Sequence, residues 1–323
     1  MAFEIATATG FDDLCDRIYN FLTANAALVG AGQQWVSPGA AGPAWAAVGV
    51  APGVNTHRAL RAPGAGTDVN LHCYLTKRSN PSTPYYNLGI SASGGFEAGQ
   101  LPFDQPNPSS YRHWITCWDA PMPYWIVADN RFMKLMVKVG ATCQTMCFGL
   151  LLPNGTPTEI PYVVYVGAVR AVAGETGLTS NHNSSTYDFA SFFDPSGYAE
   201  YRHPSGVWAP VRNHYESSGS YQADTSSSSI WPWTGSTSDL NTIATLRECF
   251  DNGGPGGEYP LFQAALISSY AGNNIIGYLP GVFWIPGFSQ TFENTLTIAG
   301  GNYVVAQSHV HSHRNAFAAF KLE

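Results

Sequence analysis

Residues 124–139 carry the pattern that most restricts how this chain can fold. Two apolar stretches, 124–128 and 131–139, flank Asp129 and Asn130, and both residue types tolerate the positive φ of a two-residue hairpin turn. Side chains of the second stretch alternate with period two. One face carries Met133, Leu135, Val137 and Val139, and the other, more polar face carries Phe132, Lys134, Met136 and Lys138. The pattern predicts an antiparallel β-hairpin.

Residues 9–25 give the strongest helical pattern in the chain. Apolar residues recur at helical spacing, at Phe11, Leu14, Cys15, Ile18 and Leu22. Thr9 is placed to cap the helix, with Asp12 three residues later in a position like that of a capping box. We expect an amphipathic helix whose apolar face packs either on a sheet of the same chain or on a partner.

Gly and Pro punctuate most of the remaining chain, which favours short strands joined by turns. Strand-like stretches occur at 45–50, 71–77, 85–90, 147–152, 162–169, 261–268, 275–285, 295–299, 303–307 and 315–322, and a short helix is predicted over 238–250. The sequence thus predicts a mainly β fold (β-rich α+β), an antiparallel sandwich or barrel-like sheets with one N-terminal amphipathic helix.

Composition divides the chain into three regions. Residues 1–172 hold the helix and a β-rich scaffold, and residues 239–323 supply C-terminal strands that complete this scaffold. Between them, residues 173–238 are rich in Ser, Thr, Tyr and Trp, which predicts a lobe or an insertion.

Charged residues are scarce. Asp, Glu, Lys and Arg make up 11% of the 323 residues, against roughly 25% in an average soluble domain. No apolar stretch is long enough to span a bilayer, and 15 Lys and Arg in a chain of net charge −7 leave no basic stripe for nucleic acid. Such a surface suits a protein that its neighbours cover, so we expect a homo-oligomer, a trimer or a hexamer.

The first residues lack the basic and long apolar segments of a secretory signal, so we expect the chain to be made and folded in a cytoplasm. Six cysteines are scattered along it, and Cys143 and Cys147 have no second pair to complete a zinc site. We expect buried free thiols, with disulfides formed after release into an oxidising medium as the alternative.

Three histidines form the most distinctive short motif. His309, His311 and His313 share one face of a predicted strand, where neighbouring imidazoles can share a transition metal. A flat strand keeps the outer two too far apart to bind one ion, so the site would need several chains. The alternative is a polar strand face near an interface, or a pH-sensitive contact there. No other cofactor is expected.

Catalytic patterns are weak. Glycosidases need paired carboxylates, and nothing pairs Asp119 with Glu159. The chain has neither a G-x-S-x-G elbow nor a phosphate-binding loop with strand-to-helix context. We therefore expect no enzyme, with a cell-wall-degrading activity as a minor alternative.

Trp208, Trp231 and Trp233 lie in the Ser-rich region. Tryptophans among Ser, Gly and Tyr are typical of binding loops, and they are equally typical of an irregular lobe held together by aromatic rings. In the first reading they are candidate ligand-binding residues that stack on the sugars of a host surface glycan.

Several stretches, spread over most of the chain, carry a resemblance to a known family. They are Ala8-Thr9-Gly10, Gly32-Gln33-Gln34-Trp35, Leu60-Arg61-Ala62-Pro63-Gly64-Ala65-Gly66-Thr67-Asp68, Tyr85-Tyr86-Asn87-Leu88, Phe103-Asp104-Gln105-Pro106, Pro123-Tyr124-Trp125-Ile126-Val127-Ala128-Asp129-Asn130-Arg131-Phe132 with Val137-Lys138-Val139, and more weakly Arg314-Asn315-Ala316-Phe317-Ala318-Ala319. Through them the chain resembles tailed-bacteriophage and prophage proteins encoded among tail genes. Residues 173–260 match little, and the family often has Gly in place of Asn130 and Trp in place of Leu88.

The resemblance implies a virion structural protein of the tail tip or baseplate, without catalysis. Its partners would be other tail or baseplate proteins, and it would be made in the cytoplasm of a bacterial host and end in the phage tail. A receptor-binding or carbohydrate-binding protein on the same particle is the alternative.

Overall fold

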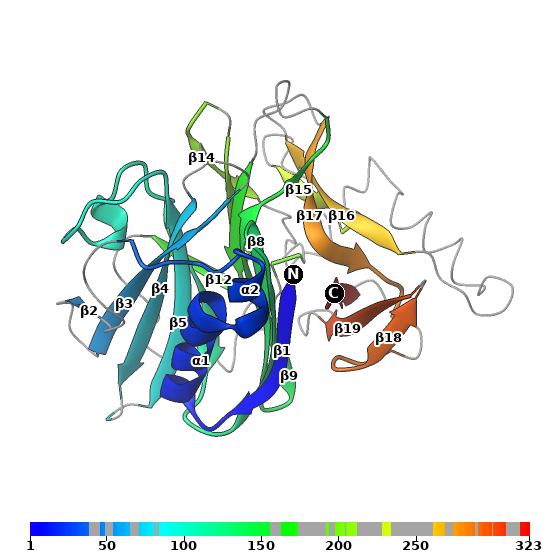
Figure 1. The fold of residues 1–323 in the computed structure, drawn as a ribbon, viewed down its shortest axis with the longest axis horizontal. Helices are drawn as coiled ribbons and strands as arrows, with labels where there is room; N and C mark the ends of the chain where they lie inside the picture. Colours follow the sequence, from blue (N-terminus) through cyan, green and yellow to red (C-terminus); the bar gives the residue numbers. More distant parts are fainter. Residues whose placement is uncertain are drawn as a thin grey trace, which may run out of the picture.

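The computed structural model describes residues 1–38, 46–48, 54–64, 71–80, 82, 84–155, 163–173, 192–193, 198–203, 205–211, 228–233, 261–268, 274–287, 290–298, 300–307 and 317–323. These residues form three antiparallel sheets and an N-terminal helical segment (Figure 1). The predicted mainly β fold is therefore confirmed. No helix in the described ranges is long and apolar enough to cross a membrane.

The central sheet has the strand order β1-β7-β8-β9-β11-β13-β14. Its strands are β1 (Ala2–Ala8), β7 (Met122–Ala128), β8 (Phe132–Val139), β9 (Thr142–Leu150), β11 (Val164–Ala168), β13 (Tyr198–Arg202) and β14 (Trp208–Val211). The predicted hairpin is confirmed as β7 and β8, which pair with Ile126 opposite Leu135. It lies inside this sheet, with β1 on one side and β9 on the other.

Two further sheets flank the central one in Figure 1. The N-terminal sheet consists, in order, of β12 (Arg170–Ala173), β6 (Tyr111–Cys117), β5 (Tyr85–Ser93), β4 (Leu71–Asn80), β3 (Val54–Ala62) and β2 (Ala46–Val48). The C-terminal sheet consists of β15 (Ser229–Trp231), β16 (Phe262–Ser268), β17 (Asn274–Trp284), β20 (Phe317–Lys321), β19 (Gly301–Gln307) and β18 (Thr295–Ile298), with β10 (Leu152–Pro153) paired to β17.

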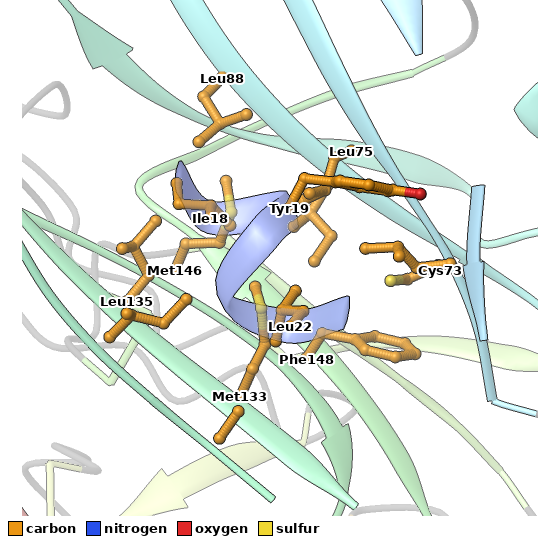
Figure 2. Close-up of a cluster of buried hydrophobic side chains, with 14 of the residues drawn as sticks. Ile18, Tyr19, Leu22, Cys73, Leu75, Leu88, Met133, Leu135, Met146 and Phe148 are labelled. Carbon is orange, nitrogen blue, oxygen red and sulfur yellow. The ribbon is translucent and has the colours of Figure 1, made fainter. Parts of the chain in front are cut away.

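Helix α1 (Phe11–Ala24) fills the space between the central and N-terminal sheets, and α2 (Ala26–Gly30) follows it directly. Figure 2 shows helix residues such as Ile18 and Leu22 between Leu75 of the N-terminal sheet and Leu135 of the central sheet. All of these side chains are fully buried. The helix therefore packs on sheets of its own chain, which was one of the two alternatives left by its sequence.

The acidic face of α1 is neutralised by the N-terminal sheet. Arg58 of β3 approaches Asp16 at 3.2 Å and lies over the ring of Tyr19, and Lys77 of β4 pairs with Asp12. Asp12 and Asp16 thus have ion-pair partners within the chain, and their side chains remain largely exposed.

The predicted cap of the helix is wrong. The N-cap residue is Gly10, which has no side chain to accept a hydrogen bond. Asp13 instead reaches back to the N–H of Thr9 at 2.8 Å, so the roles of Thr9 and Asp12 are not those of a capping box. Asp119, distant in sequence, accepts a hydrogen bond from the N–H of Phe11. A distant carboxylate can serve the helix terminus because its free N–H groups attract any nearby anion.

The opposite face of the central sheet is also buried. Trp125, Val127 and Met136 belong to a second core with Leu266 and Phe320 of the C-terminal sheet. Neighbouring residues of the hairpin, such as Ile126 and Leu135, enter the first core, because successive side chains of a strand point to opposite faces. The central sheet is therefore the middle layer of the fold.

Lys134 departs most clearly from its sequence-based expectation. The face that it shares with Met136 was predicted to be the more polar one, yet Lys134 is buried between the central and C-terminal sheets. Its ammonium donates hydrogen bonds of 3.1 Å to the carbonyl oxygens of Pro280, Gly281 and Lys321. These three acceptors satisfy the three N–H donors of the ammonium group. A buried ammonium group needs such partners because it has lost its hydrogen bonds to water.

The loop of the hairpin also differs from the predicted two-residue turn. Asp129, Asn130 and Arg131 join the strands, and none of the three has positive φ. The Asp129 carboxylate accepts hydrogen bonds from the N–H groups of Arg131 and Phe132, at 2.7 and 2.9 Å. This local side-chain bonding stabilises the loop without left-handed residues.

Gly149 lets β9 pass close to this loop. Its φ is +145°, and a Cβ atom there would overlap the carbonyl oxygen of Arg131 and the Cα of Phe132. The carbonyl of Arg131 in turn accepts a hydrogen bond of 2.8 Å from the N–H of Leu150. The position therefore requires glycine for both its conformation and its space.

The region 173–238, predicted as a lobe or insertion, supplies β13 and β14 to the central sheet and β15 to the C-terminal sheet. Most of its other residues, and the helix predicted over 238–250, lie outside the described residues. The division of the whole chain into three regions therefore stays a prediction.

We predict that Gly149→Ala lowers the free energy of unfolding by roughly 4 kcal/mol or more, because backbone strain adds to a steric overlap with backbone atoms. Gly99→Ala is the matched control. Gly99 also has positive φ, +87°, but faces open space, so only the conformational cost of about 1 to 2 kcal/mol is expected. Equal losses for the two variants in urea denaturation would contradict the close approach at Gly149.

We also predict a pH dependence caused by Lys134. Removal from water lowers the pKa of Lys134 from 10.5 to about 7, with smaller opposing effects of Asp129 and Cys147 and a reinforcing effect of Lys321. Between these two pH values the unfolded chain binds more protons at this residue than the folded one, so its contribution makes stability rise with pH over that interval. Below pH 7 both states are charged, and the contribution no longer changes.

Urea denaturation of the wild type and of Lys134→Met between pH 7 and 10 measures this contribution. Relative to the wild type, the free energy of unfolding of Lys134→Met should fall as pH rises from 7 to 10. That of Lys138→Met, which removes a partly exposed lysine from the same strand, should show no such trend relative to the wild type. Identical pH profiles for Lys134→Met and the wild type would contradict the account.

Candidate functional site

The three tryptophans predicted as ligand-binding residues are not equivalent in the structure. Trp208 is 8% exposed, and its indole N–H donates to the carbonyl of Asn107 at 3.1 Å. Trp233 is 2% exposed and packs 5.0 Å from the ring of Phe193. Trp231 is partly buried and meets the ring of Phe262 edge-on. Two of the three rings therefore serve the cores instead of a surface, and Trp231 alone of the three is not fully buried.

His309, His311 and His313 lie outside the described residues. Among the residues that the structure does describe, no group of three or more His, Cys, Asp or Glu side chains is placed to hold a metal ion. The metal hypothesis for the three histidines stays a prediction.

Of the two carboxylates considered for catalysis, Asp119 caps α1 and Glu159 lies outside the described residues. The structure draws attention instead to Glu200 of β13, which is fully buried. It accepts hydrogen bonds from the N–H groups of Ser110 and Tyr111 and lies 3.2 Å from His113 of β6. Because the side chains of both Glu200 and His113 are buried, we interpret this contact as a link between the central and N-terminal sheets.

The described cysteines, Cys15, Cys73, Cys117, Cys143 and Cys147, are buried and free, as expected. Burial raises the pKa of Cys117 and of Cys143 to about 12. A thiol must lose its proton to act as a nucleophile or a metal ligand, so these side chains behave as small apolar residues near neutral pH.

Three segments that are far apart in the sequence meet at one place, the loop after β7. Trp35 donates its indole N–H to the carbonyl of Asp129 at 2.8 Å. Asn130 donates its side-chain amide to the carbonyl of Gly64, and the N–H of Gly64 donates to the carbonyl of Asn130. Residues from 32–35, 60–68 and 123–132 thus form one hydrogen-bonded junction. Asn130 contributes to it by binding the backbone of Gly64 through both its side chain and its carbonyl.

The exposed feature that most resembles an interaction site is the edge strand β1. Within the described residues it pairs with β7 alone. Phe3 and Ile5 are 42% and 48% exposed, and both point to the same face as Val127 and Trp125, their partners on β7. An exposed apolar strand at a sheet edge offers both free backbone groups and apolar surface to another strand.

The inner face of β1 is occupied. Glu4 accepts a hydrogen bond from the hydroxyl of Tyr124, and burial together with this contact raises the pKa of Tyr124 to about 12. Ala2 and Ala8 are buried in the first core. The strand is therefore fixed on one face, and its opposite face is exposed at Phe3 and Ile5.

Strand β1 is not among the strands predicted from the sequence. Its signal was the period-two alternation of Phe3, Ile5 and Thr7 with Glu4 and Ala6. The stretch is short and precedes a strong helical pattern, which is why the alternation did not stand out.

No protein-family model matches this sequence, and no curated protein matches it at a significant level.

We predict that the three tryptophan variants separate by burial. Trp233→Ala should lower the free energy of unfolding by about 3 to 5 kcal/mol, because it leaves a cavity in the second core. Trp231→Ala should cost clearly less, so it is the usable variant for glycan-binding assays. Chemical denaturation checks both, and an equal loss at the two positions would contradict the different environments.

Proposed function

We propose that this chain is a structural component of a tailed-bacteriophage virion, in the tail or baseplate region, that acts by assembly and carries out no reaction. The observation that carries the assembly part is the exposed, uncharged outer face of β1 at the edge of the central sheet. The phage part rests on the resemblance of the quoted stretches, and three of these form a single junction in the fold.

The distribution of polar groups supports a role in assembly. The charged residues of α1 are paired within the chain, and Lys134 and Glu200 are buried with partners. Charged residues make up only 11% of the chain. Charge keeps protein surfaces apart, so a sparsely charged surface is suited to contact with other molecules. We expect a closed homo-oligomer, a trimer or a hexamer, that contacts other tail or baseplate proteins.

We predict that the purified chain has a solution mass of three or six times that of one chain, and that this mass persists on dilution. Multi-angle light scattering after size exclusion measures the mass, and negative-stain images should show rotational symmetry. A stable monomer at high concentration would contradict the proposal.

The location in the particle has its own test. Gold-labelled antibodies against the purified chain should decorate the tail end of virions released from a bacterium that carries its gene. Labelling of heads only, or its absence from virions that contain the other tail proteins, would contradict a tail role.

A further inference from the structure

Among the described residues, β1 is an edge strand with few of the features by which sheet edges avoid pairing. Its one charged residue, Glu4, lies on the inner face, where it accepts a hydrogen bond from Tyr124. The strand runs over Ala2–Ala8, and its register with β7 is regular along its whole length, without a bulge. It contains no Pro, Lys or Arg. Natural sheets protect exposed edges with such residues or with bulges, so an unprotected edge of this length is suited to pairing.

The outer face of β1 continues the second core. Phe3 lies opposite Val127 and Ile5 opposite Trp125, and both β7 residues belong to the core between the central and C-terminal sheets. Phe3 and Ile5 form its exposed margin. A strand added beside β1 would cover this margin with its own side chains.

We propose that β1 of one copy pairs antiparallel with β1 of a second copy, about a two-fold axis that passes Ile5 perpendicular to the central sheet. This inference rests on the proposed function, in which copies of the chain assemble. In this arrangement Ile5 lies beside Ile5 of the partner subunit, and Phe3 lies beside Thr7 of the partner subunit. The two central sheets become one continuous sheet.

The sequence of the strand favours this register. Ile5 is the midpoint of Ala2–Ala8, so centring on it lets the whole of both strands pair. Glu4 then lies beside Ala6 of the partner subunit. Centring on Glu4 would place two carboxylates directly opposite, which is destabilising, and centring on Ala6 would leave the first two residues of each strand unpaired.

The sequence of β1 also favours a second copy of the chain as the source of the added strand. The side chains that β1 presents on its outer face are Phe3, Ile5 and Thr7, and none is charged. On this face identical strands therefore meet without charge repulsion, and a two-fold axis sets apolar Ile5 against itself in the middle of the pair. Such a contact closes after two copies. It is compatible with a hexamer made of three dimers, and a trimer of single chains does not contain it.

Cysteine cross-linking tests the contact residue by residue. The cysteines that the structure describes are buried, and Ile5 is exposed, so Ile5→Cys adds a surface thiol at the proposed axis. With oxidised glutathione we expect a disulfide-linked dimer of this variant. Val207→Cys, at a position 64% exposed and far from β1 in sequence, is the matched control and should give little dimer.

Two further variants test the register. Phe3→Cys alone should not cross-link efficiently, because its neighbour is Thr7 of the partner subunit. Phe3→Cys combined with Thr7→Cys should form the dimer. Circular dichroism of each variant confirms that the fold is retained.

The outcomes separate this inference from the proposed function. If Ile5→Cys gives no more dimer than Val207→Cys while the wild type is oligomeric by light scattering, the β1 contact is wrong and the assembly role stands. If the wild type is monomeric under the same conditions, the proposed function fails as well. Cross-linking of Ile5→Cys together with the Phe3 and Thr7 pattern supports the contact and its register.

Discussion

The fold depends on a central sheet that is covered on both faces. Alternate side chains of β7, β8 and β9 enter two separate cores, one with α1 and the N-terminal sheet and one with the C-terminal sheet. A strand in this position has no solvent face on which to carry charge. Lys134 occurs there, and it is accommodated because a bend of β17 and the end of β20 supply three carbonyl acceptors.

The three layers of sheet offer a second explanation for the low content of charged residues. The sequence alone suggested surfaces covered by neighbouring molecules, whereas the structure shows that much of the apolar material is covered by the chain's own sheets. The helix that could have docked on a partner is buried as well. Among the described residues, Phe3 and Ile5 on the outer face of β1 remain exposed, and the proposed assembly uses this face.

Local patterns allowed the hairpin, α1 and the C-terminal strands to be predicted, because each depends on the spacing of neighbouring residues. Prediction failed where distant residues decide. The cap of α1 comes from Asp119, and the acceptors of Lys134 lie in β17 and β20. The burial of Trp208 depends on Asn107 and a core formed by other strands. The alternation in β1 was readable, but only its place at a sheet edge gives it functional meaning.

Native-state hydrogen exchange tests the central claim most directly, namely that the hairpin of β7 and β8 is the inner layer of one cooperative fold. The account predicts that the amides of β8 exchange only through global unfolding, with a protection free energy equal to the stability measured by urea denaturation. Amides of the edge strand β18 should exchange through smaller openings. If the β8 amides exchanged well below the global free energy while those of β4 and β5 stayed protected, the C-terminal sheet would not be docked on the central sheet, and the account would be wrong.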